Sequence, residues 1–239
     1  MAAGDINDDG FADLVIGTAA GQPVQVYLSD GFRDFLSPPI SLPDSSANEG
    51  IELADFDNNG TRDIVVANGG GQPDPVYSND GAGNFTLVWE LGSEPAPVAA
   101  NGGLAAEFVV APTSSHDVAV ADFNRDGNMD IVIAAIGGNP IYVGDGFGGF
   151  SLYATALGAA DSRAVAVANL DGITGSDIVF ANVGSDSQVW LNNGVDGFAA
   201  GESLPIGDAV SVTVGQFGGD ARLDLAFGRV PTFNGDVPS

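Results

Sequence analysis

The sequence contains no cysteine, no lysine and only one histidine, His116. Without cysteine the chain can form neither disulfides nor thiolate metal sites, and it has no cysteine nucleophile. A single imidazole is too few for a histidine-based zinc site.

Long apolar runs and helical periodicity are also missing. No run reaches the roughly 18 apolar residues that a membrane helix needs, so we expect no membrane insertion. No basic-then-apolar leader stands at the N-terminus, which leaves the location of the protein open. The chain of 239 residues is nevertheless 44% hydrophobic, enough for a sizeable folded core.

Positive charge is scarce. Six basic residues, all arginine, face 32 acidic residues, and the formal net charge is -26. Such a surface repels DNA, RNA and anionic membranes, so we expect no nucleic-acid partner. The carboxylates either hold cations or form a solvated, salt-adapted surface, and their spacing can decide between these alternatives.

One acidic stretch recurs along the chain. DINDDGFAD, residues 5–13, has counterparts at 55–63, 122–130, 169–177 and 216–224. The starting positions give steps of 50, 67, 47 and 47 residues, and the long step indicates an insertion at about 93–115. A period of roughly 20 to 50 residues is typical of repeat architectures.

A second landmark has the same period. In four repeats an aromatic residue stands eight positions before a phenylalanine, as the pairs Tyr27 and Phe35, Tyr77 and Phe85, Tyr142 and Phe150, and Trp190 and Phe198. Alternating and apolar runs around the acidic stretches predict four short strands per repeat. The sequence therefore predicts an all-β fold, a single β-propeller domain over 1–239 with about five four-stranded blades, the first and last incomplete.

The acidic stretches have the spacing of calcium loops. Calcium binds six to eight oxygens, which side chains at loop positions 1, 3, 5 and 9 and a carbonyl at position 7 can supply. A glycine at position 6 permits the sharp turn. The predicted ligands are Asp5, Asn7, Asp9 and Asp13 with the carbonyl of Phe11, Asp55, Asp57, Asn59 and Asp63 with the carbonyl of Thr61, and Asp122, Asn124, Asp126 and Asp130 with the carbonyl of Asn128.

The last two acidic stretches are weaker candidates. The fourth keeps Asn169, Asp171 and Asp177 but has Ile173 at position 5, and the fifth carries Arg222 among its acids. We therefore expect about three calcium sites, with the fourth stretch as a further candidate. The alternative is a turn closed by side-chain hydrogen bonds without a cation.

These motifs resemble a known family. DFNRDGNMDIVI and DINDDGFADLVI, followed by NDGAGNF and GDGFGGF, are similar to the FG-GAP/VCBS repeats of integrin-α-like β-propellers. The resemblance implies calcium in the hairpin loops between the first two strands of a blade. It also implies a secreted or cell-surface location and a role in adhesion or recognition, with ligands on the face opposite the metals.

We expect no enzyme, because no nucleophile–base set and no phosphate-binding loop is present. Two functional hypotheses remain. The first is a calcium-stabilised extracellular binding module for a glycan or a protein. The second is a structural subunit whose incomplete blades pack against neighbouring chains as a homo-oligomer or a mixed assembly.

Two further sets of residues bear on ligand binding. Glu49, His116, Arg163 and Val210 stand six residues before their acidic stretches, so they should meet at the channel mouth opposite the calcium loops. The alternative is that they are solvated strand ends. Trp89 lies outside the aromatic register, which leaves it a candidate for an exposed binding platform.

Overall fold

The structure is a computed structural model that describes residues 1–32, 34–36, 38–93, 114–153, 156–173, 175–194, 197–220 and 222–230. Within these ranges the regular elements are all β-strands. No helix in the described part of the chain is long and apolar enough to cross a membrane. The predicted insertion at about 93–115 lies almost wholly outside the described residues.

The strands form five antiparallel sheets, which confirms the predicted β-propeller. Blade one contains β1 (Ala2–Gly4), β2 (Asp13–Ile16), β3 (Gln25–Tyr27) and β4 (Ile40–Ser41). Blade two contains β5 (Asn48–Ala54), β6 (Asp63–Asn68), β7 (Asp74–Asn79) and β8 (Phe85–Leu91). Blade three contains β9 (Ser115–Ala121), β10 (Asp130–Ala135), β11 (Ile141–Gly144) and β12 (Phe150–Leu152).

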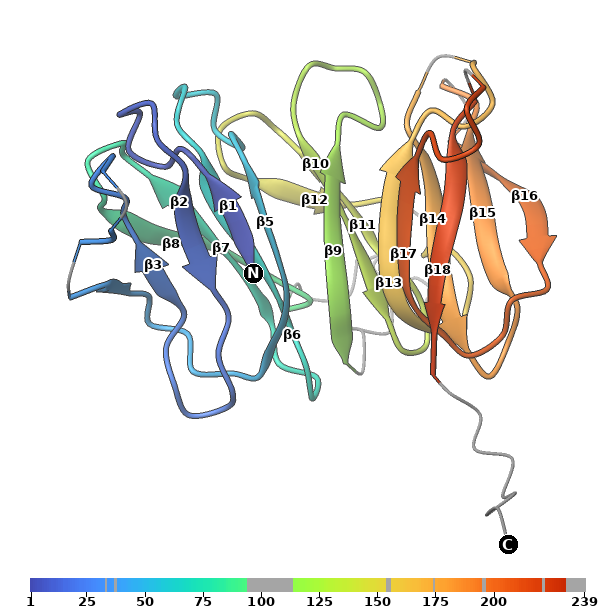
Figure 1. Cartoon of the computed structure of the whole chain (residues 1–239), viewed down its shortest axis with the longest axis horizontal. Helices are drawn as coiled ribbons and strands as arrows, with labels where there is room; N and C mark the ends of the chain where they lie inside the picture. The colour runs from blue at the N-terminus through green and yellow to red at the C-terminus, as the bar shows by residue number, and fades with distance from the viewer. Residues whose placement is uncertain are drawn as a thin grey trace, which may run out of the picture.

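Blade four contains β13 (Asp161–Ala168), β14 (Asp177–Val183), β15 (Ser187–Asn192) and β16 (Phe198–Leu204). The described part of blade five is β17 (Ala209–Gly215) paired with β18 (Asp224–Arg229). In every sheet the strands follow one another in chain order. Figure 1 shows the blades side by side, and successive blades contact one another through their first strands β5, β9, β13 and β17.

Burial explains the sequence pattern of each strand. The second strands β6 and β10 continue with four or five apolar residues after their first aspartate and are buried along their whole length, because a neighbouring blade covers each of their faces. The fourth strands β8 and β16 lie at the outer edge and are largely exposed. Apolar runs in the middle of a blade and mixed sequences at its edge are what stacked sheets require.

The core lies between blades rather than within them. One apolar cluster joins blades one and two, a second joins blades two and three, and a third joins blades three and four. Tyr77 and Tyr142 of the aromatic landmark are buried in these clusters, as expected for blade packing. Trp89 also packs there and makes an edge-on contact with Phe150, with the ring centroids 6.3 Å apart, so the prediction of an exposed platform is wrong.

The two end blades differ from the prediction and from each other. Blade one was expected to be incomplete but has four strands, because the three residues of β1 suffice to pair with β2. One face of this blade is uncovered among the described residues: Leu14, Ile16 and Tyr27 are partly exposed, whereas the corresponding residues of blade two are buried. Blade five has two described strands, as the missing landmark predicted.

Packing between blades three and four should dominate local stability. Phe180 of β14 is fully buried in the cluster that joins them. We expect Phe180→Ala to lower the free energy of unfolding by about 3–5 kcal/mol, measured by chemical denaturation. Phe147→Ala is the matched control, because this side chain is 87% exposed and should change stability by less than about 0.5 kcal/mol. Equal effects of the two substitutions would contradict the packing described.

Candidate metal centre

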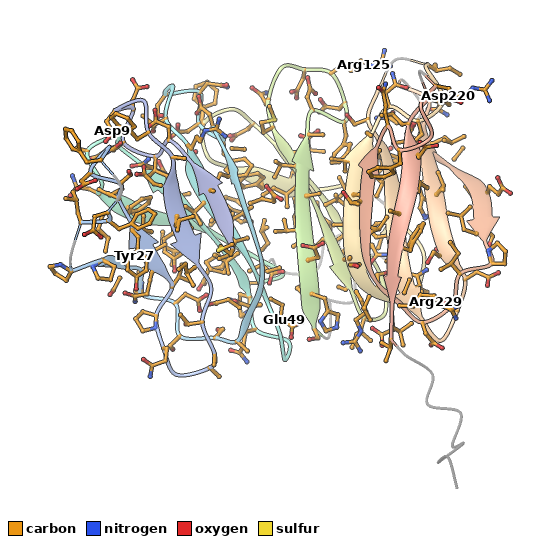
Figure 2. All side chains as sticks on the ribbon, in the orientation of Figure 1. Asp9, Tyr27, Glu49, Arg125, Asp220 and Arg229 are labelled. Carbon is orange, nitrogen blue, oxygen red and sulfur yellow. The ribbon has the colours of Figure 1, made fainter. Side chains whose placement is uncertain are left out.

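The acidic loops lie together at one edge of the molecule. They join β1 to β2, β5 to β6, β9 to β10, β13 to β14 and β17 to β18. Figure 2 shows Asp9, Arg125 and Asp220, from three of these loops, at this edge, and Glu49 and Arg229 at the opposite edge. We call the first the loop edge and the second the far edge.

The first three loops have the same backbone conformation. Position 4 is left-handed in each, with φ of 59° at Asp8, 56° at Asn58 and 64° at Arg125. Position 6 is a left-handed glycine, and the value at Gly60 is 91°. A Cβ atom on this glycine would meet nothing within 4 Å, so the backbone conformation rather than lack of space favours glycine here.

The aspartate at position 1 organises the turn by accepting two backbone hydrogen bonds. In the second loop, Asp55 Oδ1 accepts from the N–H of Asn59 at 3.1 Å, and Oδ2 accepts from the N–H of Gly60 at 2.9 Å. Asp5 and Asp122 accept the equivalent pairs in their loops. The loop therefore curls around its first carboxylate.

The aspartate at position 9 is buried and fixes the loop to the blade. Asp63 Oδ2 accepts from the N–H of Phe56 and Oδ1 from the N–H of Asn79, both at 2.8 Å. The second of these bonds joins the loop to the end of the third strand. The equivalent carboxylates, Asp13, Asp130 and Asp177, make the same two-sided contact in their blades.

The second loop brings three carboxylates together. Asp55, Asp57 and Asp63 each offer one oxygen, and these oxygens all lie within 4.8 Å of one another. Oxygens bound to one calcium ion at about 2.3–2.6 Å are separated by no more than about twice that distance, so this donor set fits calcium. The described residues contain no other such triad. In the first and third loops the three aspartates stand at positions 1, 5 and 9, with Asn7 and Asn124 at position 3.

Two of the position-9 carboxylates, Asp63 and Asp130, hold protons more tightly than ordinary aspartates. Burial raises the pKa of Asp63 to about 6, against the two backbone N–H bonds that lower it, and the neighbouring Asp57 and Asp55 raise it further. Burial likewise raises the pKa of Asp130 to about 6, and Asp126 adds to the effect. Each of these loops thus gathers negative charge that a divalent cation would neutralise.

The fourth and fifth loops have their own sets of hydrogen bonds. In the fourth, Asn169 Oδ1 accepts from Gly172 N–H at 2.8 Å and Asp171 Oδ1 accepts from Ile173 N–H at 2.7 Å. Ile173, at position 5, is exposed and offers no side-chain oxygen. In the fifth, Asp224 Oδ2 accepts from the N–H groups of Phe217 and Gly218.

Sequence reasoning missed hydrogen bonds that join one blade to the next. Asn79 Nδ2 donates to the carbonyl of Ile6 in blade one at 2.7 Å, and Asn192 Nδ2 donates to the carbonyl of Phe123 in blade three at 2.8 Å. Both asparagines are buried and stand two residues after the landmark aromatic. That fixed offset was the available signal.

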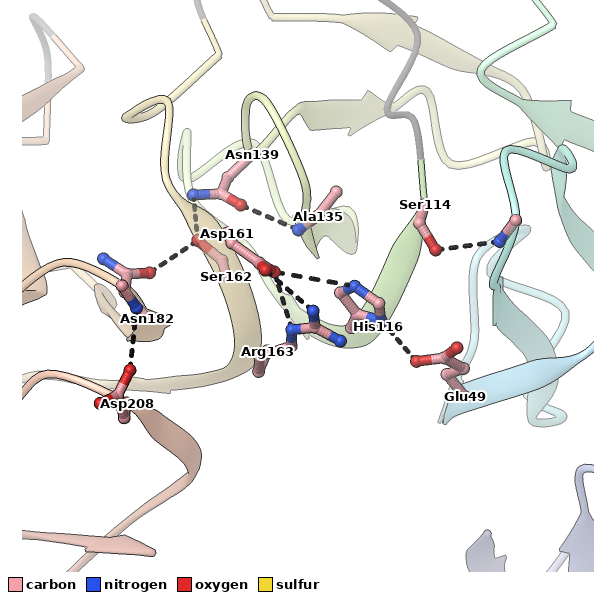
Figure 3. A network of polar contacts seen from close by, with 12 residues as sticks. Glu49, Ser114, His116, Ala135, Asn139, Asp161, Ser162, Arg163, Asn182 and Asp208 are labelled. Atoms are coloured by element: carbon pink, nitrogen blue, oxygen red, sulfur yellow. Dashed lines mark hydrogen bonds and ion pairs between the residues drawn. The ribbon is translucent and has the colours of Figure 1, made fainter. Parts of the chain in front are cut away.

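The predicted meeting of residues at the far edge is confirmed for three of the four. Glu49, His116 and Arg163 lie together, joined by Asp161, which the sequence analysis did not single out (Figure 3). Val210 makes none of the contacts drawn in this network. These contacts directly join the first strands of blades two, three and four.

A family comparison identifies the repeats. The model of the FG-GAP-like repeat matches residues 5–66 and 55–133, which together span more than half of the chain. A comparison with curated protein sequences gives no significant match.

Comparison with solved structures gives matches of different strength. A structure described as BBS1N in complex with ARL6DN has a TM-score of 0.60 and 15% identity, over 95% of this chain and 62% of that one. This chain thus spans less than two thirds of BBS1N. An Agrocybe aegerita lectin described as recognising non-reducing terminal N-acetylglucosamine gives a TM-score of 0.42 and 23% identity, over 94% and 73% of the two chains. The V. cholerae biofilm matrix protein Bap1 gives a TM-score of 0.44 and 17% identity, over 84% of this chain and 29% of that one.

The position-9 carboxylate should stabilise the fold even without a cation. Asp63→Ala leaves the N–H groups of Phe56 and Asn79 without their acceptor, at about 1–3 kcal/mol each. We expect it to lower the free energy of unfolding in chelator by about 2–4 kcal/mol. Asp57→Ala is the control, because the groups that Asp57 accepts from lie nearer to solvent, and its effect should stay below about 1 kcal/mol. The account fails if both variants lose the same stability.

Proposed function

Because the chain belongs to the FG-GAP-like repeat family, we propose that it is a calcium-stabilised, non-catalytic binding module of the extracellular space. Its ligand is a glycan or an extracellular protein. The observation that carries the calcium part is the convergence of the Asp55, Asp57 and Asp63 oxygens within 4.8 Å.

The residues that would hold calcium are those of the first three loops. In the second loop they are the side chains of Asp55, Asp57, Asn59 and Asp63 with the carbonyl of Thr61. The ion would supply positive charge to a cluster of carboxylates that otherwise repel one another. The chain's own contribution is a turn already curved by the backbone hydrogen bonds to Asp55 and anchored through Asp63.

The proposed recognition surface is the far edge. Its loops, residues 17–24, 69–73, 136–140 and 184–186, connect second to third strands, and such connecting loops often carry binding residues. Charged residues of both signs also meet there, since Arg163 and Asp161 accompany Glu49 and His116. BBS1N, which shares this fold, is described in complex with a protein, so such an array of blades can present a protein-binding surface.

Calcium removal should destabilise the protein. At free calcium tenfold above Kd each site contributes about 1.4 kcal/mol, so three sites contribute roughly 4 kcal/mol. We expect a large fall in melting temperature in chelator, and native mass spectrometry should count about three bound ions. Asp126→Ala should remove one ion. Asp186→Asn, at an exposed far-edge residue, removes a similar charge and should remove none. Unchanged melting in chelator would refute the calcium assignment.

Recognition can be tested separately from calcium. We expect a glycan array or an extracellular protein panel, probed with calcium present, to yield a ligand that protects the far-edge loops 69–73 and 136–140 from hydrogen exchange. Protection confined to the loop edge would contradict the proposed surface. If neither panel yields a ligand while calcium binding is intact, the binding hypothesis fails and the calcium assignment stands.

A second candidate function is assembly, and the uncovered face of blade one favours it. Leu14, Ile16 and Tyr27 are partly exposed, and Phe35, which packs edge-on against Tyr27 at 6.3 Å, is 39% exposed. The same face of blade two is covered by its neighbour. An apolar sheet face of this kind fits the face of another blade, supplied by a second copy of the chain.

Assembly predicts a mass that depends on concentration. We expect sedimentation to show association at high concentration, and Ile16→Asp to shift the protein to the monomer. Phe147→Asp is the control, because it places the same charge on an exposed loop-edge residue away from that face. A monomer at all concentrations would remove this candidate.

A further inference from the structure

Ionisable side chains from three neighbouring blades are in contact at the far edge (Figure 3). His116 lies near the start of β9, Glu49 lies in β5, and Asp161 and Arg163 lie in β13. Each of these strands is the first strand of its blade. A change in these contacts therefore acts on the relative placement of blades two, three and four.

The imidazole of His116 lies between two carboxylates. Its side chain is only 6% exposed, Nδ1 contacts Glu49 Oε2, and Nε2 faces Asp161 Oδ1 at 3.9 Å. Nε2 is buried and makes no hydrogen bond within the described residues. Arg163 holds Asp161 in place, with Nε 2.7 Å from Oδ1 and Nη2 donating to Oδ2 at 2.8 Å.

The number of ring protons decides how many of these contacts are favourable. A neutral imidazole carries one N–H and one lone pair, whereas the imidazolium carries two N–H groups. With Glu49 on one side and Asp161 on the other, the neutral ring turns a lone pair toward one carboxylate. The imidazolium can donate to both carboxylates, and it adds a charge-assisted attraction on each side.

We propose that His116 is a proton-operated latch between three blades. When the ring is protonated, it ties Glu49 of blade two to Asp161 of blade four. When the ring is neutral, one of the two ties is lost and the first strands of these blades are held less firmly at the far edge. The latch includes no residue of the calcium loops, so this proposal does not depend on calcium binding.

Other carboxylates lie on the same and neighbouring strands. Glu52 lies on β5 and Asp117 on His116's own strand, and Asp74 of β7 accepts a hydrogen bond from the hydroxyl of Ser115, the residue before His116. Burial raises the pKa of Glu52, with Asp117 adding to it, and burial also raises the pKa of Asp117. Because these groups titrate too, the effect of the latch has to be measured as the difference in melting temperature between the parent and a variant at each pH.

The sign of the effect follows from the contacts. The second tie exists only in the protonated form, so its contribution to stability is present at low pH and is lost as the ring loses its proton. Imidazoles change charge between about pH 5 and 8. The latch therefore strengthens the far edge in mildly acidic conditions and loosens it in alkaline ones.

The test compares melting temperatures with excess calcium at about pH 5.5 and 8. We expect His116→Gln to melt about 2–4 °C below the parent at the lower pH and close to it at the higher pH. Ser114→Ala is the matched control, because the Ser114 hydroxyl joins blades two and three by accepting from Gly70 N–H at 2.9 Å but does not titrate. The melting temperature of Ser114→Ala should lie below that of the parent by the same amount at both pH values. If His116→Gln also lies below the parent by the same amount at both pH values, the proposal is overturned.

The single histidine allows a direct second measurement. The Hε1 proton of His116 gives one histidine signal in the proton NMR spectrum, and its chemical shift reports the protonation of the ring. We expect the midpoint of this titration to move to lower pH in Glu49→Gln and in Asp161→Asn. An unchanged midpoint in both variants would refute the latch even if His116→Gln did not fold.

Discussion

A four-stranded sheet with two apolar faces can be buried only between two other sheets, and the whole molecule follows from that constraint. The second strands β6 and β10 are buried from end to end because a blade covers each side. The apolar clusters accordingly span junctions between blades instead of the interior of any one blade. Stability in such a protein is shared among neighbours, so each junction matters more than each blade.

The acidic loops have to turn the chain sharply while they hold several carboxylates close together. Left-handed residues at positions 4 and 6 make the turn, and backbone N–H groups surround the position-1 and position-9 carboxylates. These hydrogen bonds lower the pKa of Asp63 and Asp130, but burial, together with the neighbouring carboxylates, still raises it above the usual value. The geometry is therefore established by the chain, and a cation would complete its charge balance.

The fold could be predicted from the sequence because repetition supplies several independent observations of one pattern. The landmark aromatics Tyr77 and Tyr142 and the five acidic stretches predicted five blades and the order of the strands within each. Trp89 was misjudged because a single residue outside the repeat carries no positional information, and only packing against Phe150 shows its role. Asp161 was missed because it reaches His116 across a junction, and sequence offsets within one repeat do not describe contacts between two.

The junctions also show that one contact can be made by different chemical groups. The backbone carbonyl at loop position 2 accepts a hydrogen bond from the following blade at three junctions. The donor is the Asn79 side chain for Ile6, the backbone N–H of Gly148 for Phe56, and the Asn192 side chain for Phe123. Blades that look interchangeable in outline are therefore matched to a particular neighbour. A chain rebuilt with its blades in another order would keep every hairpin but would lose the partner of some of these carbonyls, so the order of the repeats is itself part of the information that specifies the fold.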